Sequence, residues 1–512
     1  MGKGSFYLTT PIYYVNDLPH IGHSYTTIAA DALARHERSK GKDVFFLTGT
    51  DEHGQKIYRA AHDGKETPEA LVNRVVDRYK QLWGRLSISN DDFIRTTEPR
   101  HTERVQEIFK KLYDKGDIYL GEYEGWYCVP CESFWTAGQL TGGNCPECNR
   151  TVERLKESNY FFRLSRYGAR ILRHIDANPD FIQPEPRKNE LRNRLLSGAD
   201  DVSVSRQSLP WGITVPMDPE QTIYVWIDAL LNYITALGYD DDGERFNRYW
   251  PADVHLIGKE ILWFHGAIWP AVLMALEIPL PKKVFAHGWW TIEGQKISKS
   301  LGNAIDPVTI TEQYGVDSYR YFVLREVPFG MDGNFSYTML VQRINSDLGN
   351  DLGNLLMRSL TMIEKYFDGR IPSPRGSGEE SAGLIGCAAG LETKVDKEMD
   401  SLQFSLALET IWDFIALTNK YIEDSKPWVL AKNDRPTLAI TLYNIAEALR
   451  LISIYIAPFM PETSQEIFSQ LGIPEEDHRQ RTERRWGALT PQTGIKKGKA
   501  LFPRIETSAQ PA

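Results

Sequence analysis

The sequence predicts an α/β fold built on a parallel sheet, interrupted by an insertion and followed by an all-α helical domain. Three observations support this prediction. A strand, a helix and a second strand follow one another between Phe6 and Leu47. Strand-type segments return at 254–258 and 284–288, and from Asp351 onward apolar residues recur at helical spacing. Alternating strands and helices are typical of a parallel sheet, whereas a long helical run is typical of a bundle.

The first strand is the run from Phe6 to Thr10, which is aromatic and β-branched and is closed by Pro11. A helix follows, with Gly41 just beyond its end, and one face of it carries Tyr25, Ile28, Ala29, Ala32, Leu33 and His36. Val44 to Leu47 form the second strand. A right-handed crossover places the first strand-to-helix turn at the carboxyl edge of the sheet, where folds of this kind bind nucleotides.

Two histidines lie at that turn, in His20-Ile21-Gly22-His23. They are three residues apart and therefore share one side of the first helical turn. The free N–H groups and the dipole of a helix start favour an anion, imidazoles can donate to phosphate oxygens, and Gly22 lets a ligand approach the backbone. Two polar residues at a helix start would give the same letters, but the position after the first strand favours a phosphate site.

A second candidate phosphate motif is the loop Lys296-Ile297-Ser298-Lys299-Ser300, with Gly294 and Gly302 on either side. Two flexible ammonium groups on such a loop can close over a polyphosphate and follow its charge as a bond breaks. A solvated lysine loop is the alternative for this stretch alone. Both motifs in this order, one after the first strand and one after the last, are much harder to obtain by accident.

At this point the sequence resembles the class I aminoacyl-tRNA synthetases. Residues 9–16, 48–54 and 224–229 are similar to the bacterial methionyl-tRNA synthetase family, and the resemblance runs from Phe6 to about 501–504. Ile297 stands where methionine is commoner in that family, an apolar exchange that leaves the two lysines undisturbed.

The resemblance implies a methionine–tRNA ligase. Such an enzyme activates L-methionine with ATP to methionyl-adenylate and pyrophosphate, then transfers the methionyl group to the 3′-terminal ribose of tRNA(Met), initiator and elongator. It uses no protein nucleophile, and Mg²⁺ is expected with the ATP. The catalytic residues would be His20, His23, Lys296 and Lys299. The ATP-binding residues would be His20, Gly22, His23, Gly258, Glu260, His287, Gly288, Lys296, Ser298 and Lys299, although His287 could also be a satisfied histidine at a strand end.

Two apolar stripes at helical spacing, one starting at Trp226 and one at Ile261, could be ordinary core. The resemblance instead assigns the methionine pocket to Ile12, Tyr14, Asp51, Trp226, Leu230, Tyr233, Ile261, His265 and Trp269. Aromatic walls suit a polarizable thioether, and the Tyr14 hydroxyl or His265 could hydrogen-bond to the sulfur. The Asp51 carboxylate could pair with the substrate ammonium.

Four cysteines form two C-x-x-C pairs with thirteen residues between them: Cys128, Cys131, Cys145 and Cys148. Four thiolates at this spacing can hold a structural zinc ion. Disulfides and a redox-active pair are the alternatives, and neither suits a cytoplasmic chain at this place in the fold. By resemblance the knuckle belongs to the family members with a single zinc. Cys387 is expected to be a small buried residue.

The insertion is also rich in basic residues, which could contact the tRNA acceptor end or could form solvated helix faces: Arg163, Arg166, Arg170, Arg173, Arg187, Lys188, Arg192 and Arg194. Both interpretations stay open. In the helical domain, apolar spacing predicts helices over 404–422 and 438–456, with a linker at 367–386. There the resemblance assigns anticodon binding to Asn354, Arg358 and Trp428.

These observations divide the chain into five parts. The Rossmann-like catalytic domain occupies 1–116 and 223–292, the connective insertion 117–222 with its zinc knuckle at 125–152, the lysine-loop and stem-contact region 293–350, and the helical anticodon-binding domain 351–512. Over 512 residues the net charge is −9, so tRNA binding would need local basic patches. No run of about 18 apolar residues is present, and we expect a cytoplasmic enzyme without a leader and without membrane contact.

Two other classes of protein compete with this interpretation. A smaller nucleotidylyltransferase can share the histidine turn but has no use for a large helical domain. A non-catalytic tRNA-binding relative should have lost at least one predicted site residue, and all of them are present: His20, His23, Lys296, Lys299 and Asp51. The chain stops soon after Pro503, without the additional domain through which some relatives dimerise, so we expect a monomer.

Overall fold

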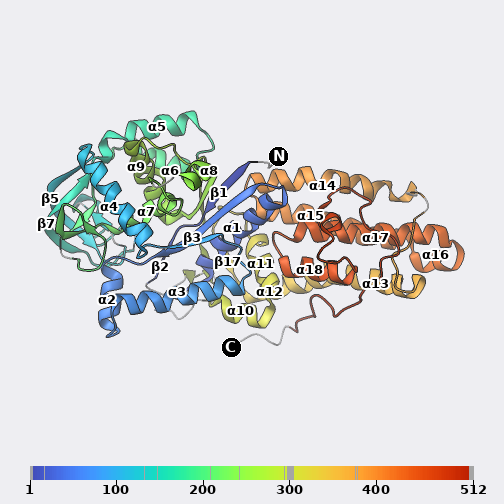
Figure 1. Cartoon of the computed structure of the whole chain (residues 1–512). Helices are drawn as coiled ribbons and strands as arrows, with labels where there is room; N and C mark the ends of the chain where they lie inside the picture. Colours follow the sequence, from blue (N-terminus) through green and yellow to red (C-terminus); the bar gives the residue numbers. More distant parts are fainter. Residues whose placement is uncertain are drawn as a thin grey trace. The chain divides into compact units, whose positions relative to one another are not determined.

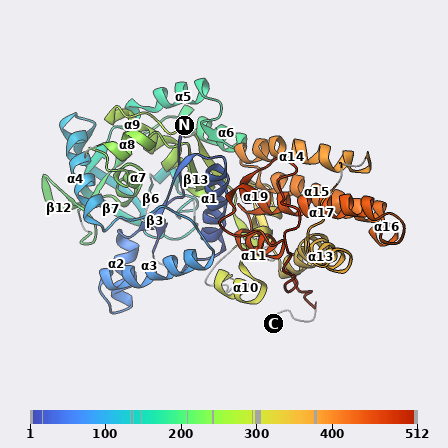
Figure 2. The ribbon, with the colours of Figure 1, turned by 45° about the vertical axis from the view of Figure 1, so that its right-hand side comes forward.

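The computed structural model describes residues 4–15, 18–131, 133–135, 137–146, 148–207, 209–240, 243–292, 295–296, 305–374, 376 and 379–506. The chain forms two compact units, which Figure 1 and Figure 2 show in two views. Unit 1 comprises residues 1–30, 41–84 and 88–289, and unit 2 comprises residues 31–40, 85–87 and 290–512.

Unit 1 is built on a seven-stranded sheet in which every described pairing is parallel, as predicted. The strand order is β2-β3-β1-β13-β14-β8, and β4 also pairs with β3. The strands are β1 Ser5–Thr9, β2 Tyr13–Tyr14, β3 Asp43–Asp51, β4 Asp92–Arg95, β8 Ile182–Gln183, β13 Val254–Gly258 and β14 Val284–His287. The helices that accompany it are α1 Ile21–Ser39, α2 Gln55–Asp63, α3 Pro68–Arg85, α4 Pro99–Asp114, α5 Gly168–Ala177, α6 Glu185–Leu196, α7 Val225–Thr235, α8 Glu244–Tyr249 and α9 Trp269–Leu276.

Strand β3 is longer than the predicted run 44–47 because it continues through Thr48-Gly49-Thr50-Asp51. These turn-type residues extend because Leu47 to Thr50 pair with β4. Gly49 is required there, since an added Cβ would lie 2.1 Å from the Ile94 carbonyl oxygen. Asp51 therefore ends a strand, at the carboxyl edge of the sheet.

The predicted insertion folds mainly as antiparallel sheet. One sheet has the order β6-β5-β7-β9, with β5 Ile118–Cys128, β6 Ser133–Trp135, β7 Glu153–Phe162 and β9 Val202–Ser203. A second has the order β10-β12-β11, with β10 Ser205–Arg206, β11 Thr214–Val215 and β12 Asp218–Ile223. Strand β8 lies within the same stretch of sequence but pairs with β14 of the parallel sheet.

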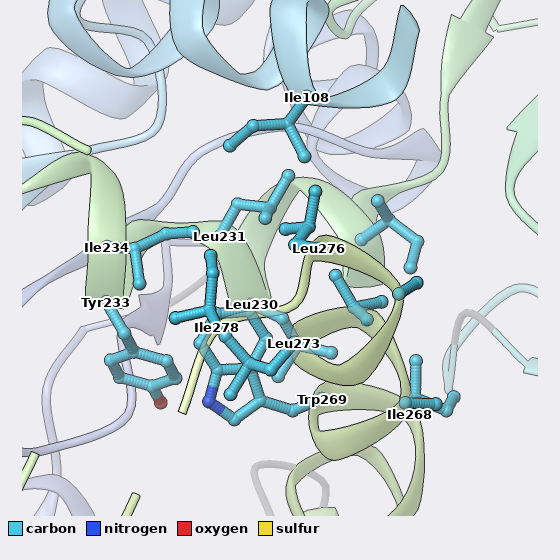
Figure 3. Close-up of a cluster of buried hydrophobic side chains, with 14 of the residues drawn as sticks. Ile108, Leu230, Leu231, Tyr233, Ile234, Ile268, Trp269, Leu273, Leu276 and Ile278 are labelled. Atoms are coloured by element: carbon cyan, nitrogen blue, oxygen red, sulfur yellow. The ribbon is translucent and has the colours of Figure 1, made fainter. Parts of the chain in front are cut away.

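The core of unit 1 holds α7 and α9 together. Figure 3 shows Leu230, Leu231 and Ile234 of α7 gathered with Trp269 and Leu273 of α9, and all of these side chains are buried. Because both helices are packed on this side, the remaining faces of α7 are held in a defined orientation.

Unit 2 joins a small sheet to a helical bundle. The sheet has the order β16-β15-β17, with β15 Trp290–Ile292, β16 Gln295–Lys296 and β17 Gly333–Phe335. Its helices are α10 Pro307–Tyr314, α11 Val316–Arg325, α12 Tyr337–Arg343, α13 Asn354–Phe367, α14 Ala382–Asp400, α15 Phe404–Ser425, α16 Pro427–Asn433, α17 Arg435–Ile456, α18 Pro461–Gln470 and α19 His478–Thr482. A π-helical segment, Ile344–Gly353, joins α12 to α13, so the predicted domain boundary at 351 falls within a continuous helical run.

The helices predicted over 404–422 and 438–456 correspond to α15 and α17. By length and composition, α17 is the one helix among the described residues that could cross a membrane, but 89% of its apolar window is buried inside the protein. Its neighbours in the bundle account for that apolar character. Cys387 on α14 is only partly buried, contrary to prediction.

Candidate active site and metal site

The histidine turn lies at the start of α1. The rings of His20 and His23 stack with their centroids 3.9 Å apart. The N–H of Gly22 donates to His20 Nδ1 at 3.1 Å, and the N–H of His20 donates to His23 Nδ1 at 3.2 Å. An added Cβ at Gly22 would lie 3.0 Å from His20 Cε1, so glycine is what lets this ring fold against the turn.

These contacts set the tautomer of both rings. Because each Nδ1 accepts a hydrogen bond, each hydrogen lies on Nε2, and the two Nε2–H groups are the donors that a ligand would meet. Burial lowers the pKa of His20, although Glu260 opposes this, and burial and the charge of His20 lower the pKa of His23. Both imidazoles are therefore neutral donors near pH 7.

Three further residues that the sequence predicts for the ATP site lie where β13 and β14 end. Gly258 and His287 are register partners, and the Glu260 carboxylate lies so close to Gly258 that an added Cβ would be 2.3 Å from Oε1. His287 Nε2 lies 2.7 Å from Thr26 Oγ1 of α1. Burial lowers the pKa of His287, with Gly288 and Glu260 opposing this. The structure thus brings the ends of β1, β13 and β14 together at one sheet edge.

The lysine motif is only partly described. Lys296 is in β16, opposite Thr291, and its side chain is not described. Ser298 and Lys299 lie outside the described residues.

Three of the predicted methionine-site residues form a buried aromatic group. The Tyr233 hydroxyl lies 2.7 Å from His265 Nε2, and the Tyr233 and Trp269 ring centroids are 5.8 Å apart. His265 Nδ1 lies 3.0 Å from the Ile261 carbonyl, so it carries the hydrogen and Nε2 accepts from Tyr233. Burial lowers the pKa of His265 to about 4. Both ring nitrogens of His265 are engaged, so its role is to hold Tyr233 rather than to contact a ligand sulfur itself.

The other members of the predicted set come from several segments of unit 1. Tyr14 of β2 and Asp51 of β3 are neighbours in register, and Asp51 is 7% exposed. Leu230 is buried in the core, and Ile12 and Ile261 are partly buried against it. Sequence reasoning treated the stripe through Ile261, His265 and Trp269 as α-helical, whereas the structure has a π-helical segment, Phe264–Ile268, at this point.

Trp226, which is also predicted for the methionine site, packs against another aromatic ring. Its ring stacks on Phe264 with centroids 3.7 Å apart and an interplanar angle of 10°. On this side lies a cavity of about 420 Å³, and of the predicted methionine-site residues it is lined by Trp226 alone. The methionine site assigned from the sequence is therefore not this cavity but the group around Tyr233.

The four cysteines converge as predicted. Their sulfur atoms all lie within 4.8 Å of one another, with Cys128 to Cys148 at 3.5 Å and Cys131 to Cys145 at 4.0 Å. A tetrahedron with Zn–S bonds of about 2.3 Å has edges of about 3.8 Å, so the donor set fits zinc. All five cysteines of the chain are free thiols, which excludes the disulfide alternative in this structure.

The thiols of this cluster differ in acidity. Burial raises the pKa of Cys128 to about 12 and raises that of Cys131 as well. Burial opposes ionisation of Cys148 too, but hydrogen bonds from the Arg150 backbone and the other thiols outweigh it and lower its pKa. A bound cation would supply the charge that this cluster needs in order to ionise fully.

The predicted anticodon residues are on two helices of unit 2. Asn354 is exposed at the start of α13, and one turn later Arg358 forms an ion pair with Glu423 near the end of α15. Trp428 follows in α16 and is 41% exposed, which is unusual for so large an aromatic residue. The Arg358–Glu423 contact connects α13 to the segment that leads into Trp428.

Most of the basic residues of the insertion have partners within the protein. Arg166 pairs with Asp117, Arg187 with Glu190 and Arg192 with Asp176. The guanidinium of Arg163 lies over the Tyr119 ring and that of Arg194 over the Trp263 ring. These contacts within the protein are enough to explain the basic residues even if no nucleic acid binds here. The tRNA role of this stretch therefore stays a prediction.

Sequence reasoning missed several residues that shape the site. His255 is buried beneath Tyr233 and Trp269, bonded to Thr9 Oγ1 at 2.8 Å, and Tyr79 Oη lies 3.3 Å from His23 Nδ1. His53 and His101 both contact Asp228. Nothing in their local sequence patterns indicates these partners, which are 56 to 246 residues apart.

Comparison with known proteins finds two family models in the chain. The model described as tRNA synthetases class I (M) matches residues 6–155 and 151–360. The model described as the anticodon-binding domain of tRNA ligase matches residues 384–492. Together they match most of the described chain.

Curated relatives and solved structures agree with these models. The methionine–tRNA ligase of Caldanaerobacter subterraneus subsp. tengcongensis is 57% identical over 99% of this chain and 80% of its own length. That of Bacillus subtilis is 49% identical over 99% of this chain and 79% of its own length. The structure of Mycobacterium tuberculosis methionyl-tRNA synthetase in complex with methionyl-adenylate superposes with a TM-score of 0.94 at 45% identity, covering 98% of this chain and 100% of that one.

Proposed function

The chain belongs to the class I methionyl-tRNA synthetases, and we propose that the carboxyl edge of its parallel sheet carries out methionine activation. The enzyme is a methionine–tRNA ligase: it converts L-methionine and ATP to methionyl-adenylate and pyrophosphate, then transfers the methionyl group to the terminal ribose of tRNA(Met). The observation that carries the proposal is the convergence of the histidine turn, Glu260 and His287 at one edge.

In the first step the methionine carboxylate attacks the α-phosphorus of ATP in line, and pyrophosphate leaves. His20 and His23 present Nε2–H donors to the phosphates, and Lys296 and Lys299 follow the negative charge onto the leaving group. Ser298, in the same loop, also binds the ATP. Glu260, beside Gly258, accepts from the ribose hydroxyls, and His287 with Gly288 contacts the adenine. Positioning and charge stabilisation supply the rate, so no covalent enzyme intermediate is needed.

Methionine binds between Asp51 and the aromatic group. The Asp51 carboxylate takes the ammonium, and Trp226, Tyr233 and Trp269 enclose the thioether together with Ile12, Tyr14, Leu230 and Ile261. His265 holds Tyr233, as its engaged ring nitrogens support. The hydrogen bond to the sulfur would then come from the Tyr14 hydroxyl. A leucine side chain has no atom that could accept this bond.

Recognition of tRNA uses the helical domain. Trp428 offers an exposed ring on which an anticodon base can stack, and Asn354 and Arg358 hydrogen-bond to bases of a splayed loop. The proposed tRNA partners are both the initiator and the elongator tRNA(Met). Such an enzyme is expected in the cytoplasm, as a monomer, and light scattering of the purified chain would test the second point.

Two metal ions complete the proposal. Cys128, Cys131, Cys145 and Cys148 would hold Zn²⁺, and because all four ligands would come from the protein, the role of the ion would be structural. Mg²⁺ accompanies the ATP phosphates and neutralises their charge.

Pyrophosphate exchange into ATP, measured without tRNA and with each of the twenty amino acids, tests this function. We expect exchange with methionine alone. Lys299→Ala should lower the exchange rate far more than it raises the KM for methionine, because its role is in the transition state. Exchange with none of the amino acids, from folded protein, would contradict the proposal.

A further inference from the structure

A buried carboxylate on α7, Asp228, joins the segment that carries Asp51 to the helix that carries Trp226 and Tyr233. Its Oδ2 accepts from His53 Nδ1 at 2.7 Å, and its Oδ1 accepts from His101 Nε2 at 2.7 Å. Asp228 and His101 are fully buried, and His53 is 6% exposed. Burial would raise the pKa of Asp228, but the two histidines outweigh it and lower that pKa, so the group is a carboxylate.

On one side of Asp228, the segment that follows Asp51 is fixed by a dense set of hydrogen bonds to Glu52. The Glu52 carboxylate accepts from Arg95 at 2.7 and 2.9 Å, from Thr50 at 2.6 Å and from Thr97 at 2.7 Å. The Glu52 carbonyl accepts from Trp211 Nε1 at 2.6 Å. His53 follows directly, so its bond to Asp228 ties a rigid segment to α7.

On the other side, the same carboxylate fixes the rotation of α7 about its axis. His101 of α4 contacts Asp228 through Nε2 and Thr235 through Nδ1, at 2.7 and 2.8 Å. These two residues lie seven positions apart on one face of α7, two helical turns from each other. Trp226 and Tyr233, also seven positions apart, lie on a different face of the same helix.

We propose that Asp228 is a positioning residue for methionine recognition, because through His53 and His101 it sets the separation between the Asp51 carboxylate and the aromatic face of α7. The inference rests on the proposed role of Asp51. An amino acid spans this separation, with its ammonium at one end and its side chain at the other. The Asp228 network therefore controls which length of amino acid satisfies both ends together.

The experiment compares pyrophosphate exchange of Asp228→Asn with wild type. The amide can accept from only one of the two histidines, so the other bond is lost. We expect the KM for methionine to rise about tenfold, the loss of one hydrogen bond to a charged group, with the KM for ATP unchanged. Inhibition by 4-(methylthio)butanoate, which lacks the ammonium, should stay as in wild type. Equal weakening of methionine and this analogue would overturn the proposal.

A second pair of variants tests the link directly and does not depend on the tolerance of position 228. In His53→Asn the amide nitrogen replaces Nδ1 as the donor to Asp228, whereas His53→Ala has no donor. We expect the KM for methionine of the asparagine variant to stay within about twofold of wild type and that of the alanine variant to rise about tenfold. The same KM in both variants would overturn the proposal.

A double-mutant cycle with Asp51→Asn separates the two proposals. If Asp51 binds the ammonium, Asp51→Asn alone raises the KM for methionine, and adding Asp228→Asn raises it little further. No effect of Asp51→Asn would contradict the proposed function, whereas fully additive effects would contradict only the role of Asp228. Asp117→Asn is the matched control, since Asp117 is a buried carboxylate of unit 1 bonded to Tyr167 and Arg166.

Discussion

At the scale of single residues, the proposed phosphate site offers neutral imidazoles rather than cations. The two rings of the histidine turn accept backbone N–H groups at Nδ1 and so keep their hydrogens on Nε2. A protonated pair at a centroid separation of 3.9 Å would be repelled, and burial disfavours the charge further. Full positive charge at this site must come from elsewhere, and the lysine loop is the proposed source.

Substitutions that mimic one ring nitrogen test the predicted tautomer of His23. A glutamine amide nitrogen can take the place of Nε2, whereas an asparagine amide nitrogen takes the place of Nδ1. We expect His23→Asn to slow adenylate formation about one hundredfold and His23→Gln to slow it much less. Only the asparagine variant loses the Nε2–H donor to the charge that develops on the phosphates. Rapid-quench measurement of adenylate formation checks this. Equal rates for the two variants would show that Nε2 is not the donor.

The pH dependence of stability tests the buried state of His265. Its pKa is about 4 in the folded chain and about 6.5 when unfolded. The unfolded state therefore binds the proton first, so the stabilisation is complete above pH 6.5 and is lost as the pH falls toward 4. The linkage relation gives a loss of about 2 kcal/mol between pH 7 and pH 5.

Urea unfolding at pH 7 and pH 5 measures this loss. In His265→Gln the difference between the free energies of unfolding at the two pH values should shrink by about 2 kcal/mol, whatever the variant's stability at pH 7. The same pH dependence in both proteins would mean that His265 is protonated in the folded chain.

At the scale of elements, helix α16 presents its exposed apolar residues at one end. Trp428 and Val429 are 41% and 42% exposed. Pro427 occupies the first turn of the helix, where a missing N–H does no harm, and so orients the two residues that follow. A surface that folding leaves uncovered in this way is available for a partner, which supports the anticodon proposal.

Trp428→Ala should therefore weaken tRNA charging while leaving adenylate formation intact. Loss of one stacked base is worth about 1–3 kcal/mol, or roughly a ten- to hundredfold rise in the KM for tRNA. Val429→Ala is the control, because Val429 lies in the same helix and is about as exposed as Trp428 but has no aromatic ring. Pyrophosphate exchange and aminoacylation are measured in parallel. A loss of both activities in Trp428→Ala would show that the helical domain has been assigned the wrong role.

Within unit 2, a buried arginine holds elements that are distant in sequence. Arg320 of α11 is fully buried and bonds to Asp31 at 2.7 Å and to the carbonyls of Leu86, Pro458 and Phe459. Asp31 also pairs with Arg35 at 2.7 Å, so this buried carboxylate is shared by two arginines. The second half of α1 is thus fixed by a residue that follows it by 289 positions.

Arg320→Met should lower the stability of unit 2 by about 3–5 kcal/mol, because the buried Asp31 keeps only Arg35 as an ion-pair partner and three buried carbonyls lose their donor. The double variant Asp31→Asn, Arg320→Met should recover part of this loss. Scanning calorimetry measures both. A double variant no more stable than Arg320→Met would mean that the carbonyl contacts, rather than the ion pair, carry the effect.

At the scale of the whole molecule, the four-cysteine segment 125–152 has little hydrophobic core of its own. Between the cysteine pairs, residues 133–135 pair with β5, whereas residues 137–144 are mostly exposed and are paired only by isolated bridges. A metal ion would supply the missing stabilisation. Its effect on the rest of the chain should be limited, because the parallel sheet and its core are built by other residues.

Metal analysis of purified protein should find one zinc per chain. Chelation, or Cys145→Ser, should expose the segment 125–152 to limited proteolysis while the thermal transition of unit 2 stays unchanged, since the ligands all come from unit 1. Mass spectrometry of the fragments locates the cleavage. Resistance of 125–152 in metal-free protein would show that the knuckle folds without zinc.

The sequence by itself determined those features that depend on local pattern. Strand β13 spans the predicted 254–258, Gly41 has the positive φ expected after a helix, and the four cysteines meet because two short knuckles need only one turn each. The family and its chemistry also follow from linear motifs. The periodicity of apolar residues was enough to predict α15 and α17, because their buried faces repeat every few residues, whereas α14 begins at Ala382, inside the predicted linker 367–386.

Only the tertiary structure decided which distant groups meet. The extension of β3 through Asp51 depends on its pairing with β4, and the π-helical turn at His265 has no pattern in the sequence. The histidines on Asp228 come from 127 and 175 residues away. Local pattern reports what a residue does to its own segment, whereas these contacts arise from packing and from the pairing of buried polar groups that only the folded chain brings together.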